Sequence, residues 1–500
     1  MIDLDTLPAR ISDVPRRIAA RTPDAPALRE AGRCVSYADL VRQVDQYAAL
    51  LRDLGVRPGD RLMVVGENSV AQVALIFACA SIDAWMVNVN ARLSGRELAA
   101  IRAHCRPRRV LYTSAVSPEA AAHAAHDGAT ALGELMAGAL DQECEPEPVD
   151  AGGGQVAALI YTTGTTGRPK GVMLTHRNLL FVAAVSSTLR GLTAHDRAYG
   201  VLPISHVYGL ASVMLGTLYA GACLQLAPKF SAADMLRAIR DDGLTIVQAV
   251  PAMYARLLEL AGGADAALVS RLRFCYAGGS PLDPVLKRNV ERLLGLPLHN
   301  GYGLTESAPT VCQTRLDAPR GDTSVGFAIP GVEVRIAGAA GEPGELWVRG
   351  PNVMKGYYRE PALTEAAMRP GGWLNTGDVA RMDPDGALFI VGRTRELIIR
   401  SGFNVYPLEV ETVLNAHPAV TQSAVVGRAV AGGNEEVVAF VEPDPRHTVD
   451  VDELHAWLAE RLAAYKRPSE IIVMAALPAA PTGKVLKNEL KMLAQRAVAG

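Results

Sequence analysis

The chain has 500 residues, which is too long for one ordinary hydrophobic core, since a domain usually takes about 100–200 residues. Its composition is 49% hydrophobic and 20% charged, which excludes a largely disordered chain, a coiled coil and a collagen-like chain. The formal net charge is -2 and only 5% of the residues are aromatic, so neither property predicts nucleic acid as a partner.

The sequence has no segment that would place it in a membrane or outside the cell. No stretch reaches the roughly 18 uninterrupted apolar residues that span a bilayer, and the charged N-terminus lacks the apolar region of a secretory signal. The 7 cysteines are scattered without C-x-x-C pairs, so we expect reduced, mostly buried thiols. We therefore expect a soluble, cytoplasmic protein.

The first predicted helix begins after Ser36, which forms a capping box with Asp39. Apolar residues then recur on one helical face, and Gly55 ends the helix. A turn leads into a short apolar strand at 61–65, and a further apolar helix and strand follow to about Val89. This alternation of strand and helix predicts a mostly parallel sheet with helices on its faces.

Two later regions differ in character. Residues 115–154 are rich in alanine and end in an acidic patch and consecutive glycines, which indicates a surface connection. The alternating pattern resumes over 155–280. Between 326 and 391, glycine, proline and short β runs predict a smaller, more antiparallel region.

The last part of the chain has a compact α+β pattern. Residues 425–426 and 437–441 are strand-like, and 452–465 are helix-like. We place the boundary near 393–396, giving an N-terminal domain of residues 1–394 and a C-terminal lid domain of residues 395–500. The predicted fold class is α/β, with a large N-terminal domain of βα-type parallel sheets, a β-rich subdomain and a small mobile α+β C-terminal domain.

The strongest local signal is the run Tyr161-Thr-Thr-Gly-Thr-Thr-Gly-Arg-Pro-Lys-Gly171, which follows a short apolar stretch. Its threonine hydroxyls, backbone N–H groups and Lys170 suit a polyphosphate, because they supply hydrogen-bond donors and positive charge. The run does not match the Walker A pattern. It predicts a phosphate-binding loop rather than a plain polar turn.

This run resembles the phosphate loop of the acyl-adenylate-forming superfamily, which includes acyl-CoA synthetases, adenylation domains of peptide synthetases and firefly-type luciferases. The resemblance extends from about residue 15 to 490. Further family motifs follow in order: Pro203-Ile-Ser-His-Val-Tyr-Gly209, Ala277-Gly-Gly-Ser-Pro281, Gly301-Tyr-Gly-Leu-Thr-Glu306, Gly344-Glu-Leu-Trp-Val-Arg-Gly350, Trp373-Leu-Asn-Thr-Gly-Asp378, Gly392-Arg393, Ser401-Gly-Phe-Asn-Val-Tyr-Pro407 and Pro481-Thr-Gly-Lys484. The family implies that a carboxylate attacks the α-phosphate of ATP, giving acyl-AMP and pyrophosphate, and that a thiol then displaces AMP.

By this resemblance, the ATP site draws on several motifs. Tyr302 would offer a face on which adenine stacks, Asp378 would accept hydrogen bonds from the ribose hydroxyls, and Arg393 would help from the interdomain edge. The expected ATP-binding residues are Thr162, Thr163, Gly164, Thr165, Thr166, Gly167, Lys170, Gly279, Ser280, Pro281, Asn300, Gly301, Tyr302, Gly303, Asp378 and Arg393.

The resemblance also implies four catalytic residues. Lys484 would reach the α-phosphate and the attacking carboxylate, and Thr305 would hold phosphate oxygens. Glu306 would be the ligand of Mg²⁺, the expected cofactor, because hard oxygen suits that ion. His206 would lie beside the carboxylate and the thiol path. We do not assign it as a general base, because a thiol with a pKa of about 8.5 is already partly ionised at neutral pH.

The segment after the Gly-Arg motif looks like that of stand-alone CoA ligases. Gly402 would line the pantetheine path, where a side chain would block it. Arg400 and Lys466 are candidates for binding the CoA phosphates, with solvated basic side chains as the equal alternative. The hinge position is Arg395, where the family usually has Asp or Lys.

The sequence defines the carboxylic acid substrate less well than the ATP site. The pocket should be lined by His206, Ala252, Met253, Gly278, Gly303 and Val311. No arginine stands in the inner parts of these stretches, which disfavours a dicarboxylate. A medium- or long-chain fatty acid is the first expectation, and a hydroxycinnamate- or benzoate-type acid is the second.

Alternatives from other classes stay open at this point. They are an acyl-AMP ligase that loads a carrier protein and a binding protein that keeps the fold without turnover. The expected partners are a small carboxylic acid, ATP and CoA, with no nucleic acid, and a homodimer is left open.

Overall fold

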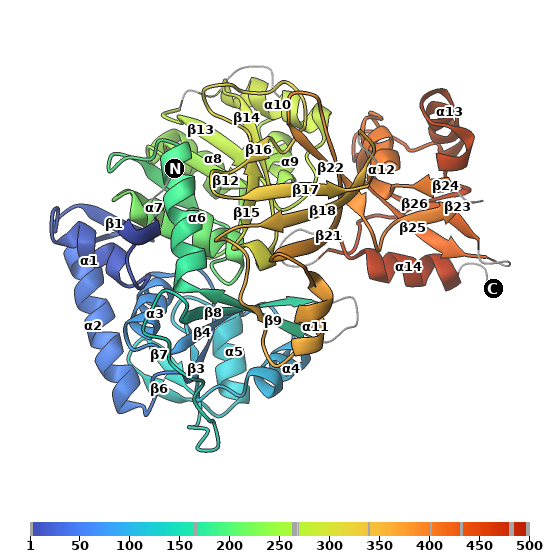
Figure 1. Ribbon diagram of the computed structural model, residues 1–500. Coiled ribbons are helices and arrows are strands. Elements are labelled where there is room, and N and C mark those ends of the chain that lie inside the picture. Colours follow the sequence, from blue (N-terminus) through green and yellow to red (C-terminus); the bar gives the residue numbers. More distant parts are fainter. Residues whose placement is uncertain are drawn as a thin grey trace.

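The structure is a computed structural model that describes residues 4–163, 169–262, 268, 270–338, 341–400, 403–430, 434–479 and 485–496. Two large sheets with their helices form the first part of the chain. The C-terminal segment lies to one side of them, at the right of Figure 1 in orange and red. The predicted α/β class is confirmed.

One large sheet has eight strands in the order β19-β9-β8-β4-β3-β5-β7-β6. Its central strands β8, β4, β3 and β5 are parallel, as the alternating pattern predicts. Helices α4 (Gly95–Cys105) and α5 (Pro118–His126) belong to this part. The strands are β3 (Arg61–Gly66), β4 (Trp85–Asn90), β5 (Arg109–Tyr112), β6 (Thr130–Leu132), β7 (Leu135–Ala137), β8 (Val156–Thr163), β9 (Pro169–Thr175) and β19 (Gly356–Tyr357).

The second large sheet has nine strands in the order β16-β15-β14-β13-β12-β10-β11-β1-β2. Strands β14 to β1 in this order are parallel, and β15 and β16 at one end and β2 at the other pair antiparallel. The strands are β1 (Pro26–Glu30), β2 (Arg33–Ser36), β10 (Arg197–Gly200), β11 (Cys223–Leu226), β12 (Ile246–Ala249), β13 (Phe274–Ala277), β14 (Leu298–Gly303), β15 (Thr310–Gln313) and β16 (Phe327–Ala328), with helices α8 (Ala232–Asp241), α9 (Pro251–Leu260) and α10 (Pro284–Leu294).

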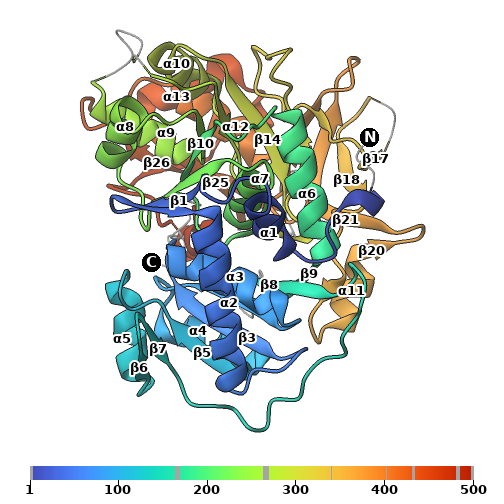
Figure 2. The same ribbon diagram turned by 90° about the vertical axis from the view of Figure 1, so that its left-hand side faces the viewer.

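The two sheets share one hydrophobic core with buried helices. Helices α3 (Val70–Ser81) and α6 (His176–Leu189) contribute to this core, and α3 is buried nearly all round, which is why its sequence is apolar without a polar face. Figure 2 shows α3 beside α2 (Tyr37–Asp53), against which it packs. The remaining helices here are η1 (Leu4–Thr6), α1 (Asp13–Ala19), the π-helix η2 (Tyr208–Leu215) and α7 (Gly216–Tyr219).

The first predicted helix is confirmed as α2 (Tyr37–Asp53). The side chain of Ser36 accepts the N–H of Asp39, and the carboxylate of Asp39 accepts the N–H of Ser36, so both halves of the capping box form. The predicted apolar face is buried, and Gly55 adopts a positive φ of 79° after the helix.

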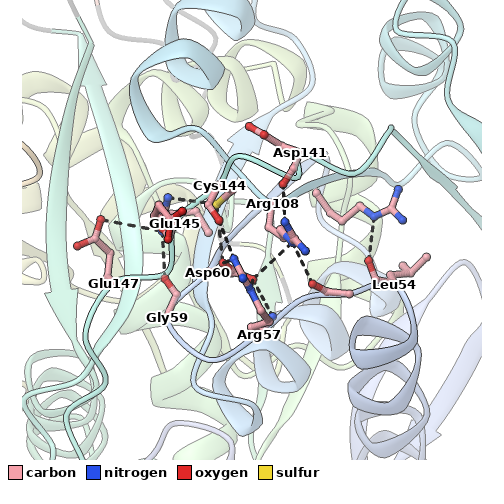
Figure 3. Close-up of polar contacts among 12 residues, drawn as sticks. Leu54, Arg57, Gly59, Asp60, Arg108, Asp141, Cys144, Glu145 and Glu147 are labelled. Carbon is pink, nitrogen blue, oxygen red and sulfur yellow. Dashed lines mark hydrogen bonds and ion pairs between the residues drawn. The ribbon is translucent and has the colours of Figure 1, made fainter.

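The expected surface connection contains helix α5 and strands β6 and β7, and then a segment bound to the sheet (Figure 3). In this segment, residues 141–147, backbone carbonyls are held by arginines of the neighbouring strand and turn. Arg57 donates to the carbonyl of Cys144 and the buried Arg61 donates to that of Glu145, each at 2.6 Å. The connection is therefore part of the eight-stranded unit.

The predicted antiparallel region is confirmed. Its strands pair in the order β17-β18-β21-β20, with β22 beside β21. They are β17 (Glu333–Ala337), β18 (Gly344–Arg349), β20 (Met368–Arg369), β21 (Trp373–Met382) and β22 (Leu388–Arg393), with helix α11 (Pro361–Ala367) between them in the chain.

Beyond β22, the chain has two small hydrophobic clusters of its own, formed only by residues from 398 onward. The predicted helix at 452–465 is shorter, because Leu462 is extended and a 3-10 turn follows. No helix of the described part of the chain is long and apolar enough to cross a membrane. The elements are β23 (Ile398–Arg400), β24 (Phe403–Val405), α12 (Pro407–Asn415), β25 (Val420–Ala429), β26 (Glu435–Pro443), α13 (Val451–Arg461), η5 (Ala464–Lys466), β27 (Glu470–Val473) and α14 (Lys487–Arg496).

Candidate active site

A cleft of about 2910 Å³ lies between the nine-stranded sheet, the antiparallel region and the C-terminal elements. It brings together residues from motifs that are far apart in the sequence. The expected site residues that line it are Thr162, Lys170, His206, Ala252, Gly278, Gly279, Ser280, Pro281, Asn300, Gly301, Tyr302, Gly303, Thr305, Glu306, Asp378, Arg393 and Arg395.

Two glycines of this wall are required by close contacts. A Cβ on Gly303 would lie 2.0 Å from the carbonyl oxygen of Pro309, and a Cβ on Gly278 would lie 3.0 Å from the ring of Tyr208. A side chain at either position would displace the neighbouring backbone or ring. The motifs therefore carry glycine at these two positions, where the wall of the cleft leaves no room for a side chain.

The buried carboxylate of Asp378, on β21, has two partners in the cleft. The hydroxyl of Tyr302 donates to Oδ2, and Nε of Arg393 lies 3.0 Å from Oδ1. Burial and the charge of Asp378 raise the pKa of Tyr302 well above 10, so Tyr302 stays a donor. Burial lowers the pKa of Arg393, but Asp378 and nearby Glu396 outweigh that effect and raise it. The predicted ribose acceptor is thus oriented from both sides.

Glu306 lies in the short 3-10 helix η3 (Thr305–Ser307), directly after β14. Its Oε1 accepts a hydrogen bond of 2.8 Å from the hydroxyl of Tyr357, and Nζ of Lys170 lies 5.5 Å from the centroid of the Tyr357 ring. Burial and the Glu306 charge raise the pKa of Tyr357, which keeps it a donor. Sequence reasoning missed Tyr357, because its place opposite Glu306 depends on β19 pairing with β9.

The carboxylate oxygens of Glu306 suit a divalent cation that binds together with nucleotide phosphates. Among the described residues, no group of three or more His, Cys, Asp or Glu side chains could hold a metal alone. Mg²⁺ usually takes one or two protein carboxylates and completes its shell with phosphate oxygens and water. One carboxylate at Glu306, in a cleft that Thr305 also lines, fits that requirement.

His206 is exposed at the start of the π-helix η2. Its Nδ1 accepts the N–H of Tyr208 at 3.2 Å, so the neutral imidazole carries its proton on Nε2. A π-helix is rare, and such segments frequently occur at functional sites. The geometry holds the ring at the cleft wall in one orientation.

The predicted acyl pocket is partly corrected. Val311 is 0% exposed and Met253 only 9% exposed, and both belong to the hydrophobic core instead of lining the cleft. On β15, successive side chains point to opposite faces, and Thr310 and Cys312 line the cleft on either side of Val311. Val311 and Met253 therefore do not form the cleft wall, and an acyl-binding role for the other residues assigned to the pocket stays a prediction.

The expected CoA-binding cations are engaged elsewhere in the C-terminal part, and neither lines the cleft. Nη1 of Arg400 donates to the carbonyl of Arg467 at 2.5 Å, and Nζ of Lys466 lies 2.8 Å from a carboxylate oxygen of Glu409. A role in binding CoA phosphates stays a prediction for both.

Several predicted residues lie outside the described residues. They are Gly164, Thr165, Thr166, Gly167, Gly402 and Lys484. The side chain of Thr163 is also not described. Ala479 and Val485 pair with each other and line the cleft. Arg400 and Phe403 do not line it.

Comparison with known proteins agrees with this geometry. A model of AMP-binding enzymes matches residues 15–358, and a model of the AMP-binding enzyme C-terminal domain matches residues 409–484. The chain therefore belongs to the family of AMP-binding enzymes. Within that family it is an acid–thiol ligase that uses ATP.

Individual relatives extend over nearly the whole chain. A feruloyl-CoA synthase of Amycolatopsis sp is 38% identical over 491 residues, covering 95% of this chain and 97% of that protein. An indoleacetate–CoA ligase of Aromatoleum aromaticum is 35% identical, with 96% and 97% covered. The solved structure of the o-succinylbenzoate coenzyme A synthetase of Bacillus subtilis, in complex with ATP and magnesium ion, aligns with a TM-score of 0.83 at 30% identity, covering 96% of this chain and 99% of that one.

Proposed function

We propose that this enzyme joins an aryl carboxylic acid to coenzyme A, by way of an acyl-AMP intermediate formed from ATP. The observation that carries the proposal is the agreement between relatives of nearly full length, named for ferulate and indoleacetate, and a cleft built from the adenylate-forming motifs. The expectation of a fatty acid has no support among these relatives. The runner-up, a hydroxycinnamate- or benzoate-type acid, therefore takes its place.

In the first half-reaction, an oxygen of the acid carboxylate bonds to the α-phosphorus of ATP and pyrophosphate leaves. Catalysis is then positioning and charge neutralisation. Lys170, Thr162 and Thr305 would hold phosphate oxygens, and Glu306 would hold Mg²⁺, which neutralises phosphate charge when bound. Asp378 would accept the ribose hydroxyls, sharing its oxygens with Tyr302 and Arg393.

In the second half-reaction, the thiolate of CoA bonds to the acyl carbon and AMP leaves. We assign Lys484 to the first half and the pantetheine path beside Gly402 to the second, and we place the domain boundary at 394/395 with Arg395 as hinge. Arg395 lines the cleft, as do Ala479 and Val485 on either side of the Lys484 segment. That placement supports a C-terminal domain that takes part in the first half-reaction.

The proposal is tested by supplying the enzyme with ATP, Mg²⁺ and single acids, and by measuring pyrophosphate release and CoA thioester separately. Cinnamate-, benzoate- and indoleacetate-type acids are compared with medium- and long-chain fatty acids. A kcat/KM for the best aryl acid that exceeds the best fatty acid by roughly tenfold, the size of one well-filled pocket contact, is expected. A preference for fatty acids would overturn the proposal.

Two controls address the remaining alternatives. Replacing CoA by a carrier protein would give a protein-bound thioester only if the enzyme is a carrier-loading ligase. Omitting Mg²⁺ should stop pyrophosphate release. Light scattering and fractionation of cells check the homodimer and the cytoplasmic location, which stay predictions.

A further inference from the structure

The deep wall of the cleft contains a buried arginine that belongs to none of the motifs. Arg190 follows α6, lines the cleft and is only 3% exposed. Its guanidinium lies over the ring of Tyr276, with 4.7 Å to the centroid. Nη1 donates to Oε1 of Gln248 at 2.6 Å, and Nη2 donates to Oε1 of Gln313 at 3.1 Å. Within the described part of the chain, Nε has no hydrogen-bond partner.

The charge of Arg190 is not balanced by a carboxylate. No acidic side chain of the described residues lies within ion-pair distance of it, and its hydrogen-bond and ring partners are two neutral amides and a tyrosine ring. His299, on β14, is also uncharged at neutral pH, because burial and the charge of Lys287 lower its pKa to about 4. A buried cation without an anionic partner is costly, and a guanidinium has five N–H donors to satisfy.

Arg190 lies close to the proposed acyl pocket. Gln248, Tyr276 and His299 are register partners on β12, β13 and β14, so they stand side by side across the sheet. Gly278 follows two residues after Tyr276, about 7 Å further along the chain direction. The ring of Tyr208 contacts the Cβ position of Gly278. Burial raises the pKa of Tyr208, and the charge of the nearby Arg190 opposes that rise.

We propose that Arg190 is a specificity-determining residue, which donates a hydrogen bond to an oxygen at the end of the acid that is remote from the reacting carboxylate. The inference rests on the proposed aryl-acid function and narrows it to acids with a para-oxygen. If it holds, an arginine outside the assigned stretches would contact the acid, in place of the expected pocket without arginine. Arg190 was missed because it lies in none of the stretches assigned to the pocket and reaches it only through the packing of α6 on the sheet.

The experiment compares four acids that share one skeleton: cinnamate, para-hydroxycinnamate, para-methoxycinnamate and para-carboxycinnamate. For the wild-type enzyme, at least one acid with a para-oxygen should exceed cinnamate in kcat/KM by roughly 10- to 100-fold, the range for a hydrogen bond to a charged group. The para-substituted acid with the highest kcat/KM then identifies the group that Arg190 contacts as a phenol, an ether or a second carboxylate.

The ratio of kcat/KM for the best para-substituted acid to kcat/KM for cinnamate is then measured in Arg190→Met and Arg190→Lys. The ratio should fall to within about threefold of one in Arg190→Met and to an intermediate value in Arg190→Lys, because lysine keeps the charge but loses the planar fork. Arg349→Met, which removes an exposed guanidinium paired with Glu333, is the matched control and should leave the ratio as in the wild type.

The outcomes separate this inference from the proposed function. Equal use of cinnamate and the para-substituted acids by the wild type, or an unchanged ratio in Arg190→Met, would overturn the inference while leaving an aryl-acid ligase in place. A loss that is equal for all four acids would assign Arg190 to holding Gln248 and Gln313 alone, and would also overturn it. Failure of the wild type on every aryl acid would overturn the proposed function itself.

Discussion

The hydroxyl of Tyr302 donates a hydrogen bond to Oδ2 of Asp378, across the cleft from β14 to β21. Arg393 holds the other carboxylate oxygen, at 3.0 Å from Oδ1. The residue expected to stack on adenine is therefore joined to the residue expected to bind ribose. Both parts of the nucleoside would meet a surface whose orientation is fixed before ATP arrives.

Tyr302→Phe should separate the two roles of this side chain. It keeps the ring face and removes the hydroxyl, so we expect KM for ATP to rise by roughly 3- to 10-fold, the size of one hydrogen bond of this kind, with little change in kcat. Tyr302→Ala should raise KM for ATP further, because it also removes the stacking face. If the two variants have equal KM values for ATP, the ring does not contact the adenine.

Glu306→Ala should reduce the rate of pyrophosphate release by roughly 30- to 1000-fold, which corresponds to about 2–4 kcal/mol for one lost electrostatic contact in a transition state. The Mg²⁺ concentration needed for half the maximal rate should also rise. Tyr357→Phe is the matched control, since it removes the 2.8 Å hydrogen bond to Glu306 but keeps the carboxylate. Near wild-type pyrophosphate release in Glu306→Ala would exclude Glu306 from the site.

The fold was predictable where local signals agree with packing. The capping box of Ser36 and Asp39 and the buried face behind it define α2, and the apolar run at 61–65 defines β3. Such patterns specify one face or a fully buried strand through local chemistry. The motif residues that line the cleft were assigned from the resemblance to the adenylate-forming superfamily, and their roles in binding ATP stay predictions.

Other features depend on contacts between distant segments. Val311 is apolar and close to the motif, yet only the register of β15 against β14 decides that Thr310 and Cys312 face the cleft instead. Arg190 and Tyr357 carry no motif, and they reach the site through packing of α6 and pairing of β19. A single sequence contains no local signal for such placements.

Acid should destabilise the fold through His176, at the start of α6. Burial, helped by the charge of Arg10, lowers the pKa of His176 to about 3, while an unfolded histidine titrates near 6.5. The unfolded chain thus takes up this proton first, and stability is lost as the pH falls from about 6.5 towards 3. The upper limit is about 1.4 kcal/mol for each pH unit.

The measurement is the midpoint of thermal unfolding at about pH 7 and about pH 5. His176→Asn should show a smaller drop between the two, because asparagine does not titrate and can still accept the N–H of Ile11, which lies 3.2 Å from Nδ1 of His176. His126→Asn, at the exposed end of α5, is the control and should keep the full drop. An equal drop in His176→Asn would show that other groups govern the acid response.

The two half-reactions should need different faces of the C-terminal domain. In the present arrangement, Arg256 of α9 lies 3.8 Å from Glu442 of β26, and Lys487 contacts Glu396, beside the proposed hinge, at 2.9 Å. Ala479 and Val485 line the cleft, while Arg400 and Phe403 do not. If one domain presents Lys484 first and the Gly402 face second, the chain near Arg395 must rotate between the steps.

Lys484→Ala and Gly402→Leu should therefore fail in opposite halves of the reaction. Lys484→Ala should lose pyrophosphate release from ATP but still convert supplied acyl-AMP and CoA to thioester. Gly402→Leu should do the reverse, because its side chain would fill the pantetheine path and leave the first step intact. Pyrophosphate release and thioester formation from synthetic acyl-AMP are measured separately on both variants, with folding checked by circular dichroism. Equal loss of both halves in both folded variants would contradict an alternating C-terminal domain.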